Sequence, residues 1–360
     1  MTNLAAVLHG PGKLEIRDVG TPDAVPGGIS IEMMLSGVCG SDVHLYEGQA
    51  GALPISVILG HEGVGRIATL GAGVSTDYAG QTVSVGDLVY WAPIALCGAC
   101  YTCTVLEQTP CEKSSFFEDA EKPNWGTFQE RIWLPARQPF YKLLDGTDPV
   151  ALAAMGCALP TALKAFDQVR PVRPGETVVI QGAGPVGLAT AMMASVSGAS
   201  NVVVLDSVAA KLEVARTMGA TATLDLSMTT AEERRAAIYE LAGPTGPTVV
   251  VEATGALPAF VEGSDLTGVN GTYVVLGLLG DVGRTDVHPG DISWRNKSIG
   301  GATFPKIKHY YYAVQLARKL QDRFPLADLV SHRFKIADTE AALRAVGSGE
   351  TVKAVIDATL

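Results

Sequence analysis

Two kinds of hydrophobic pattern divide the chain. Up to about residue 160, short apolar runs such as 29–35 are separated by Gly- and Pro-rich turns, which is typical of short β-strands. From Glu176 onward, apolar runs alternate with helical stretches such as 209–218 and 231–241. The apolar runs that predict strands are 178–180, 202–205, 222–224, 248–251 and 273–276. Strands that alternate with helices predict an α/β fold with a right-handed, doubly wound parallel sheet.

The alternation of strands and helices ends near Phe304. Residues 309–324 predict a long amphipathic helix, and 352–357 predict a short final strand. The uncharged stretch 177–205 is long enough to cross a membrane, but its glycines and turn-like breaks favour a strand, a helix and a strand of a buried parallel sheet. The N-terminus lacks a charged region followed by a long apolar run, so we expect no secretory signal and a cytoplasmic protein.

Composition and charge exclude several classes of protein. Of the 360 residues, 47% are hydrophobic and 18% are charged, which is ordinary for a globular protein of two or three domains. Asp and Glu number 37 against 27 Lys and Arg, so the formal net charge is −10. Nucleic acids and anionic membranes are bound by basic surfaces, so we expect neither as a partner.

Four of the six cysteines form the pattern C-x2-C-x2-C-x7-C on one short loop, at Cys97, Cys100, Cys103 and Cys111. A disulfide framework is a weak alternative, because such scaffolds are short and secreted. A nucleic-acid-binding zinc ribbon usually separates its two cysteine pairs by about 15–20 residues, and that spacing is absent. Closely spaced thiols in a reducing compartment indicate a tetrahedral zinc site. With four protein ligands the site is closed, so this zinc would be structural.

A glycine-rich turn of the form G-x-G-x-x-G joins the first strand of the second region to a helix. The glycines let the backbone approach a pyrophosphate at the helix N-terminus, where unpaired N–H groups favour anions. The next strand ends 19 residues later in a carboxylate, which can accept hydrogen bonds from ribose hydroxyls and repel a 2′-phosphate. An ordinary turn followed by a helix-capping Asp is the alternative. We predict a site for NAD rather than NADP at Gly182, Gly184, Pro185, Val186, Gly187 and Asp206.

Three further residues have the chemistry of a second metal site. Cys39, His61 and Cys157 lie far apart along the chain, and sequence spacing alone does not show that they meet. Buried small apolar side chains and a core histidine are the alternatives. Two thiolates and one imidazole would leave one coordination position open, which is the arrangement of a catalytic zinc site.

The combination of motifs resembles the zinc-dependent alcohol dehydrogenases of the medium-chain dehydrogenase/reductase family from end to end. The resemblance rests on G-H-E at 60–62, C-x-S-D-x-H at 39–44, the four-cysteine loop, C-x3-T at 157–161 and the glycine-rich turn followed by Asp206. It implies a mostly-β, GroES-like, zinc-binding catalytic domain of residues 1–158 and 303–360. It also implies a Rossmann NAD-binding domain of residues 159–302, two zinc ions per chain, and a homodimer or homotetramer.

The resemblance implies that Cys39, His61 and Cys157 bind a catalytic zinc ion. Asp42 would orient His61 through a hydrogen bond that fixes the imidazole tautomer. Glu62 would lie behind the metal and tune its field, with a solvated carboxylate as the alternative. An alcohol bound at such an ion becomes far more acidic, because the cation stabilises the alcohol's anion.

The resemblance also implies cofactor contacts and a proton relay. Lys211 would contact the ribose, Thr161 would lie near the nicotinamide, and Lys353 would contact the pyrophosphate, with a surface lysine as the alternative for Lys353. Ser41, a ribose hydroxyl and His44 would carry the alcohol proton to solvent. Histidine suits the last step because its ordinary pKa is near neutrality.

The predicted function is that of a zinc-dependent oxidoreductase, which transfers a hydride between NAD and an alcohol/carbonyl pair. The resemblance implies an apolar primary or secondary alcohol, cyclic ones included, because bulky residues lie near in sequence to those that line the pocket in relatives, although core packing explains them equally well. These residues are Trp91, Pro93, Phe116, Phe117 and Trp125.

Two departures from the family pattern bear on substrate and cofactor. Many polyol dehydrogenases carry Glu where this chain has Cys157, and some relatives carry a basic cofactor contact where it has Gly40. A polyol or hydroxy-amino-acid dehydrogenase stays open as an alternative. So do a zinc-free quinone or enoyl reductase and a non-catalytic scaffold that binds zinc and NAD.

Overall fold

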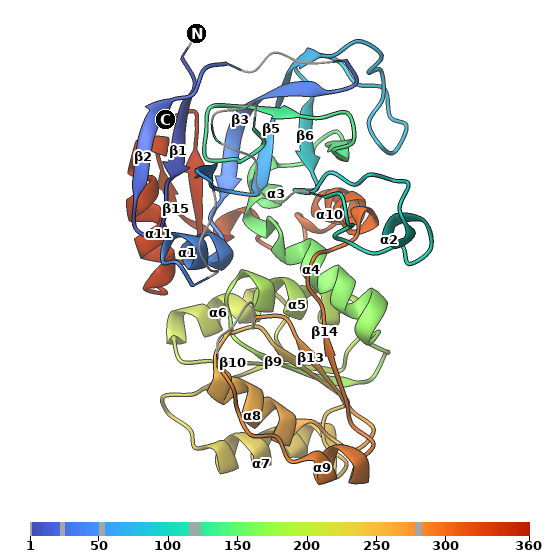
Figure 1. Ribbon diagram of the computed structural model, residues 1–360. Helices are drawn as coiled ribbons and strands as arrows, with labels where there is room; N and C mark the ends of the chain where they lie inside the picture. The colour runs from blue at the N-terminus through green and yellow to red at the C-terminus, as the bar shows by residue number, and fades with distance from the viewer. Residues whose placement is uncertain (1, 22–25, 50–54, 115–119, 121–123, 278–282) are drawn as a thin grey trace. The chain divides into compact units, whose positions relative to one another are not determined.

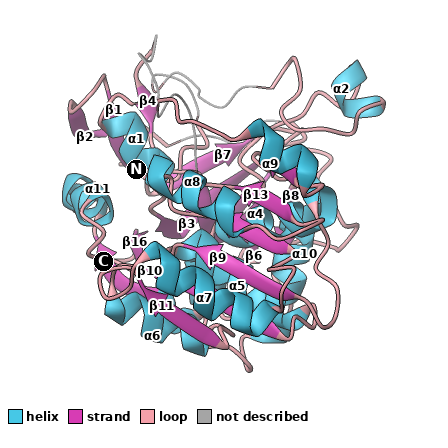
Figure 2. Ribbon diagram, turned by 90° about the horizontal axis from the view of Figure 1, so that it is seen from below, coloured by secondary structure: helices cyan, strands magenta, loops and turns pink. Residues whose placement is uncertain are grey.

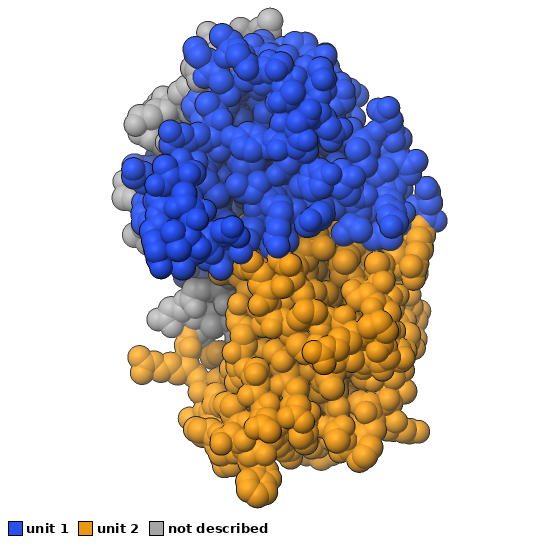
Figure 3. All heavy atoms as spheres, turned by 90° about the vertical axis from the view of Figure 1, so that its right-hand side faces the viewer, with its two compact units in different colours: residues 1–157, 306–322, 326–360 blue, residues 158–305, 323–325 orange. Residues whose placement is uncertain are grey.

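The computed structural model describes residues 2–21, 26–49, 55–114, 120, 124–277 and 283–360. The chain forms two compact units, each assembled from separate stretches of sequence (Figure 3). Unit 1 contains Met1–Cys157, Lys306–Asp322 and Leu326–Leu360. Unit 2 contains Ala158–Pro305 and Arg323–Pro325.

Unit 1 is built mainly from antiparallel strands in two sheets (Figure 1). The smaller sheet has the order β2-β1-β4, and the larger has the order β15-β16-β3-β5-β6-β8, with β7 also paired to β3. Alternating apolar residues of β3 pack in a core cluster with Trp91 and Ile132, so the large sheet buries one face. The strands are β1 (Leu4–Leu8), β2 (Leu14–Asp18), β3 (Ile29–Gly37), β4 (Val57–Ile58), β5 (Glu62–Leu70), β6 (Leu88–Trp91), β7 (Arg131–Leu134), β8 (Phe140–Lys142), β15 (Val330–Phe334) and β16 (Lys353–Asp357).

Helices of different lengths accompany the strands of unit 1. The helix α3 begins after Asp148, whose side chain accepts a hydrogen bond from the Val150 N–H at 2.8 Å, and Pro149 occupies its first turn. The helix α1 packs against α11. The helices are α1 (Gly40–Tyr46), α2 (Tyr101–Thr104), α3 (Pro149–Met155), α10 (Ile307–Leu320) and α11 (Thr339–Gly347), with 3-10 turns at Ala327–Leu329 and Ile336–Asp338.

Unit 2 is a doubly wound sheet of six parallel strands in the order β11-β10-β9-β12-β13-β14. Figure 1 shows α5 and α6 on one face and α7 and α8 on the other, and Figure 2 views the sheet from the α7 and α8 side. The order reverses between β9 and β12, which is where sheets of this kind bind ligands beyond the carboxyl ends of the strands. The strands are β9 (Thr177–Gln181), β10 (Asn201–Asp206), β11 (Ala222–Asp225), β12 (Val249–Glu252), β13 (Thr272–Val275) and β14 (Ser298–Gly301).

The helices of unit 2 cover both faces of this sheet. Thr230 and Glu233 form a reciprocal capping box at the start of α7, which satisfies two backbone N–H groups there. The helices are α4 (Ala158–Lys164), which continues as a π-helix over Ala165–Val169, α5 (Pro185–Val196), α6 (Ala209–Thr217), α7 (Ala231–Ala242), α8 (Leu257–Leu266) and α9 (Pro289–Trp294).

The predicted fold class is confirmed, and the five predicted strands of unit 2 match β9 to β13 within one residue at every end. The pattern analysis missed β14, because its sequence Ser-Ile-Gly-Gly contains one apolar side chain and is largely exposed. It also placed the helix α10 at 309–324, whereas the helix runs over Ile307–Leu320.

Among the described residues, no single helix combines the length and the hydropathy of a membrane span. The bent pair Pro149–Met155 and Ala158–Val169 meets the criteria of length and composition only when the two helices are taken together.

Candidate active site

The four-cysteine loop forms a compact cluster in unit 1. Its four sulfur atoms all lie within 4.8 Å of one another, and the Sγ atoms of Cys97 and Cys103 are 3.9 Å apart. The short helix α2 begins after Cys100 and carries Cys103, which turns both thiols toward the same point. Thiolates at about 2.3 Å from one ion lie about 3.8 Å apart, so the cluster fits tetrahedral zinc. All four thiols, Cys97, Cys100, Cys103 and Cys111, are free.

A second cluster forms in unit 1 from three separate segments. Cys39 lies at the N-terminus of α1, His61 immediately precedes β5, and Cys157 follows α3. The ligand atoms of these residues and a carboxylate oxygen of Glu62 all lie within 4.8 Å of one another. The two sulfurs are 3.7 Å apart although 118 residues separate them. The donor set is that of a catalytic zinc site, since three ligands leave one position open.

Asp42 connects two of these ligands. Its buried carboxylate accepts a hydrogen bond from the backbone N–H of Cys39 at 2.9 Å and faces Nδ1 of His61 at 3.3 Å. A carboxylate can only accept here, so Nδ1 carries the proton and Nε2 is left for a metal. Burial disfavours a charged His61, but the Asp42 carboxylate outweighs it and raises the pKa of His61 well above its usual value.

Each cluster combines at least one thiol whose pKa is lowered with at least one, such as Cys157 or Cys100, whose pKa is raised. The Cys157 thiol donates toward Cys39, and this contact, despite burial, lowers the pKa of Cys39 well below its usual value. In the four-cysteine loop, the backbone N–H of Ala99 lowers the pKa of Cys97 to about 6. Thiolate is the form that binds zinc, so both sets of residues fit the predicted metals.

Lys353 does not occupy the predicted place. Its side chain is 2% exposed, and Nζ forms an ion pair with Oε2 of Glu62 and lies 3.4 Å from the Val38 carbonyl oxygen. The expected pyrophosphate contact is therefore wrong for this structure, because the ammonium group is buried and already paired. Glu62 is likewise buried rather than solvated, and its Oε1 accepts from the Cys157 N–H at 3.0 Å.

The two predicted relay residues lie one turn apart on α1. Ser41 is in the first turn and half-buried, and Nδ1 of His44 is hydrogen-bonded to Oε1 of Gln49. Residues at i and i+3 share one face of a helix, so both side chains are on the same side of α1. Among the described residues, no hydrogen bond joins Ser41 to His44.

The glycine-rich turn joins β9 to α5 in unit 2. Gly182 has φ +100°, a conformation that favours glycine, and a Cβ on Gly187 would lie 1.9 Å from the Gly182 carbonyl oxygen. Gly184 caps α5, and Pro185 and Val186 lie in its first turn. The backbone N–H groups at this end of the helix have no partner within the helix, so they can bind an anion.

A hollow of about 440 Å³ in unit 2 is lined by four of the nine predicted cofactor residues. Gly182, Gly184, Asp206 and Lys211 line it. The Asp206 carboxylate ends β10 and accepts from the Ala183 N–H at 2.7 Å and the Val208 N–H at 2.9 Å, which fixes both oxygens at the edge of the hollow. Thr161 lies elsewhere in unit 2, half-buried on α4.

Sequence reasoning missed Glu252 at the end of β12. It is fully buried, and its carboxylate accepts from the N–H groups of Thr254 (2.6 Å), Gly255 (2.7 Å) and Gly277 (3.0 Å). These bonds shape the loop that carries Thr254, which also lines the 440 Å³ hollow. A charged residue directly after three valines was the signal that could have revealed it.

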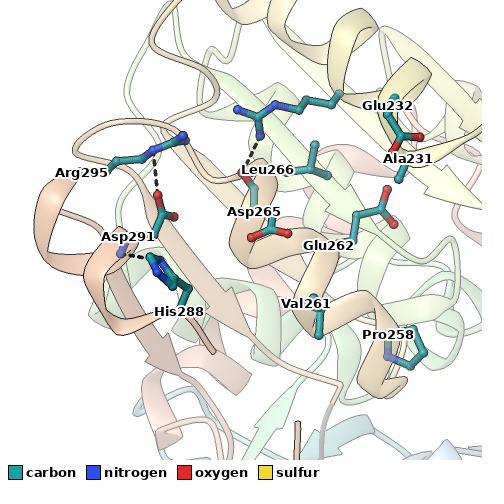
Figure 4. Close-up of a pocket in the computed structure, with 11 residues that line it drawn as sticks. Ala231, Glu232, Pro258, Val261, Glu262, Asp265, Leu266, His288, Asp291 and Arg295 are labelled. Atoms are coloured by element: carbon teal, nitrogen blue, oxygen red, sulfur yellow. Dashed lines mark hydrogen bonds and ion pairs between the residues drawn. The ribbon is translucent and has the colours of Figure 1, made fainter. Parts of the chain in front are cut away.

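A larger hollow of about 760 Å³ lies among α7, α8 and α9 of the same unit (Figure 4). Two of its charged side chains form an ion pair. Arg295 contacts Asp291 at 2.8 Å, and the Asp291 N–H donates to Nδ1 of His288 at 3.1 Å. None of the predicted ligands or cofactor residues lines it, so size alone does not mark the functional site.

The predicted substrate-lining aromatics divide into two groups. Trp91 and Trp125 are buried in a core cluster of unit 1, so packing accounts for them. Phe116 and Phe117 lie outside the described residues.

Two family models match the chain. Residues 25–145 match the alcohol dehydrogenase GroES-like domain, and residues 185–319 match the zinc-binding dehydrogenase family. Together with the fold and the two thiol clusters, these matches place the chain in the zinc-dependent alcohol dehydrogenases of the medium-chain dehydrogenase/reductase family, to which it belongs. The protein is a dehydrogenase that interconverts an alcohol and a carbonyl compound with a nicotinamide cofactor.

Individual relatives span nearly the whole chain. A 5-exo-hydroxycamphor dehydrogenase from Pseudomonas putida is 53% identical over 99% of both chains. An L-threonine 3-dehydrogenase from Deinococcus deserti is 31% identical over 94% of both. The crystal structure of an alcohol dehydrogenase from Thermotoga maritima superposes with a TM-score of 0.92 at 30% identity, over 99% of both chains.

Proposed function

We propose that this enzyme oxidises a bulky, apolar cyclic secondary alcohol of the hydroxycamphor type, with NAD as the cofactor. The observation that carries the proposal is the meeting of Cys39, His61 and Cys157 beside the buried Asp42, because this donor set leaves one position for an alcohol. The 53% identity to the hydroxycamphor dehydrogenase supports this substrate class over smaller alcohols.

The residues of the chain divide the catalytic work. The bound zinc and NAD would supply a Lewis acid and a hydride acceptor. Asp42 holds His61 in the tautomer that presents Nε2 to the metal. Ser41 follows the ligand Cys39 by two residues, so its hydroxyl could accept the alcohol proton while giving up its own toward a ribose hydroxyl of bound NAD, and His44 would pass a proton on to solvent.

The structural zinc, the cellular compartment and the oligomeric state complete the proposal. Cys97, Cys100, Cys103 and Cys111 hold a second, structural zinc ion, which gives two per chain. The six cysteines form no disulfide in the described part of the chain, which suits the reducing cytoplasm that we propose for the enzyme. A homodimer or homotetramer stays a prediction from the family.

The cofactor would lie along the glycine-rich turn of unit 2. The pyrophosphate would face the N-terminus of α5, between Gly184 and Val186, and the ribose would contact Asp206 and Lys211. Thr161 is proposed to lie near the nicotinamide, and no further role is assigned to it.

Asp206 should select NAD. We expect kcat/KM with NAD to exceed that with NADP at least tenfold, or about 1.4 kcal/mol, because the carboxylate repels a 2′-phosphate. Asp206→Asn keeps an acceptor for the Ala183 N–H but removes the negative charge. It should therefore lower the ratio of kcat/KM with NAD to kcat/KM with NADP. Asp225→Asn is the matched control at the end of the neighbouring strand β11 and should leave the ratio unchanged. Equal use of both cofactors by the parent would contradict the role of Asp206.

A panel of alcohols tests the substrate class directly. NADH absorbance should rise fastest with bicyclic and monocyclic secondary alcohols, and kcat/KM for xylitol and L-threonine should be at least about tenfold lower. An apolar pocket that lacks partners for extra hydroxyl or amino groups leaves those groups unpaired, which costs binding energy.

The alternative is a polyol or hydroxy-amino-acid dehydrogenase, favoured by the 31% identity to a threonine 3-dehydrogenase. A panel in which L-threonine or a polyol gives the highest kcat/KM would replace the cyclic-alcohol proposal with this one. Turnover with none of the alcohols would favour a scaffold without catalysis.

A further inference from the structure

A buried ion pair lies directly behind the proposed catalytic ligands. The side chains of Glu62 and Lys353 are 1% and 2% exposed, and 291 residues separate them in sequence. One carboxylate oxygen of Glu62 accepts from the backbone N–H of Cys157 at 3.0 Å, and the other is paired with Nζ of Lys353. Both oxygens are therefore engaged by donors of unit 1.

The carboxylate of Glu62 is close enough to become a fourth ligand. One of its oxygens lies within 4.8 Å of the ligand atoms of Cys39, His61 and Cys157. Carboxylate oxygen binds zinc readily, at about 2.0–2.2 Å. Four protein ligands would close the site, and a closed site holds zinc without leaving a position for substrate.

Two glycines make room for the ion pair. A Cβ on Gly37 would lie 1.9 Å from Oε2 of Glu62 and 2.8 Å from Nζ of Lys353. A Cβ on Gly156 would lie 2.4 Å from the Glu62 carboxyl carbon. Such distances do not occur in real structures, so any larger residue at these positions would displace the carboxylate.

We propose that Lys353 is a positioning residue, which together with Gly37 and Gly156 holds the Glu62 carboxylate away from the metal and so keeps the fourth coordination position open. The inference rests on the proposed zinc site. A buried carboxylate without a cation is strongly destabilising, and without Lys353 the nearest cation would be the metal itself. Glu62 would then turn from Lys353 toward the three ligands.

Cobalt(II) in place of zinc gives a readout that does not depend on turnover, because its visible bands change with coordination number and ligand type. The probe is imidazole, which binds an open position and shifts those bands. The four-cysteine site contributes the same background in every variant. We expect the parent to respond to imidazole, and Lys353→Met to need at least about tenfold more imidazole for the same shift.

The decisive variant removes both charges. In Lys353→Met/Glu62→Gln, the neutral amide is a poor zinc ligand, so the imidazole response should return to that of the parent. Gly37→Ala separates the pair without changing any charge and should lose the response as Lys353→Met does. It also keeps the test valid if Lys353→Met does not fold.

Two controls match these changes away from the site. Lys297→Met removes another buried lysine ion pair, with Asp291 in unit 2, and Gly65→Ala places a Cβ 2.4 Å from the Glu32 carbonyl oxygen in the same sheet. Both should lower thermal stability and leave the imidazole response unchanged. An unchanged imidazole response in Lys353→Met, or no recovery of the response in the double variant, would overturn this inference but leave the proposed function intact. A parent that binds cobalt only at the four-cysteine loop would overturn the proposed function as well.

Discussion

Replacement of Cys157 by serine should abolish alcohol oxidation while the chain keeps its fold. The Cys157 sulfur lies 3.7 Å from that of Cys39, and the two thiols belong to the three proposed ligands. Serine keeps the backbone N–H that bonds to Glu62, but its hydroxyl does not ionise near neutral pH and binds zinc poorly. Partners that only orient metal ligands contribute about 10- to 100-fold to affinity or activity, so loss of a ligand should lower kcat/KM at least about 10³-fold.

Metal analysis and thermal melting complete this experiment. The parent should contain two zinc ions per chain, and Cys157→Ser should retain one with a small change in Tm. Cys103→Ser is the matched change in the other cluster, and it should also lose one ion but with a larger fall in Tm, because that loop has few buried side chains of its own. Full activity of Cys157→Ser, or one zinc ion in the parent, would show that the ligand assignment is wrong.

Replacement of Ser41 by alanine should slow alcohol oxidation at least about 10²-fold, the usual contribution of a general base. Ser41 lies two residues after the proposed ligand Cys39, at the start of α1. His44→Gln should cost less, because His44 is one turn farther along the helix and a soluble base can replace it. The measurement is steady-state oxidation against pH, with and without a bulky amine buffer.

The two variants should differ in their response to added base. The amine should restore much of the activity of His44→Gln near neutral pH and leave Ser41→Ala unchanged. His9→Gln, a surface histidine bonded to Ser56, controls for the general effect of losing an imidazole. If His44→Gln keeps the pH profile of the parent and Ser41→Ala stays active, the proton leaves by another route.

Much of the fold could be predicted from the sequence because the strands of unit 2 are buried on both faces. Residues such as Val178, Val179 and Ile180 are fully buried, so selection for packing leaves continuous apolar runs that pattern analysis detects. The edge strand β14 lacks that constraint, because its side chains are exposed and two of its four residues are glycines. Its place in the sheet depends on backbone pairing with β13, which leaves no mark in hydropathy.

The metal clusters differ in how far spacing alone could define them. Cys97, Cys100 and Cys103 are neighbours along the chain, and a turn of helix is enough to bring their thiols together. The second cluster needs three segments to meet, and its residues were connected only through resemblance to a known family. The structure supplies that meeting from within unit 1.

The sequence by itself determined the local features of this protein: the alternation of strand and helix, the glycine-rich turn with its following carboxylate, and the thiol loop. Each depends on residues close together in the chain, whose spacing fixes their geometry. Only the tertiary structure decided the partner of Glu62. Lys353 matched the family's cofactor contact by its position in the sequence. The pairing of β16 with β3, however, places its side chain in the interior of unit 1, next to Glu62. There burial makes a lone charge costly, so the lysine pairs with the nearest carboxylate rather than with a phosphate at the surface.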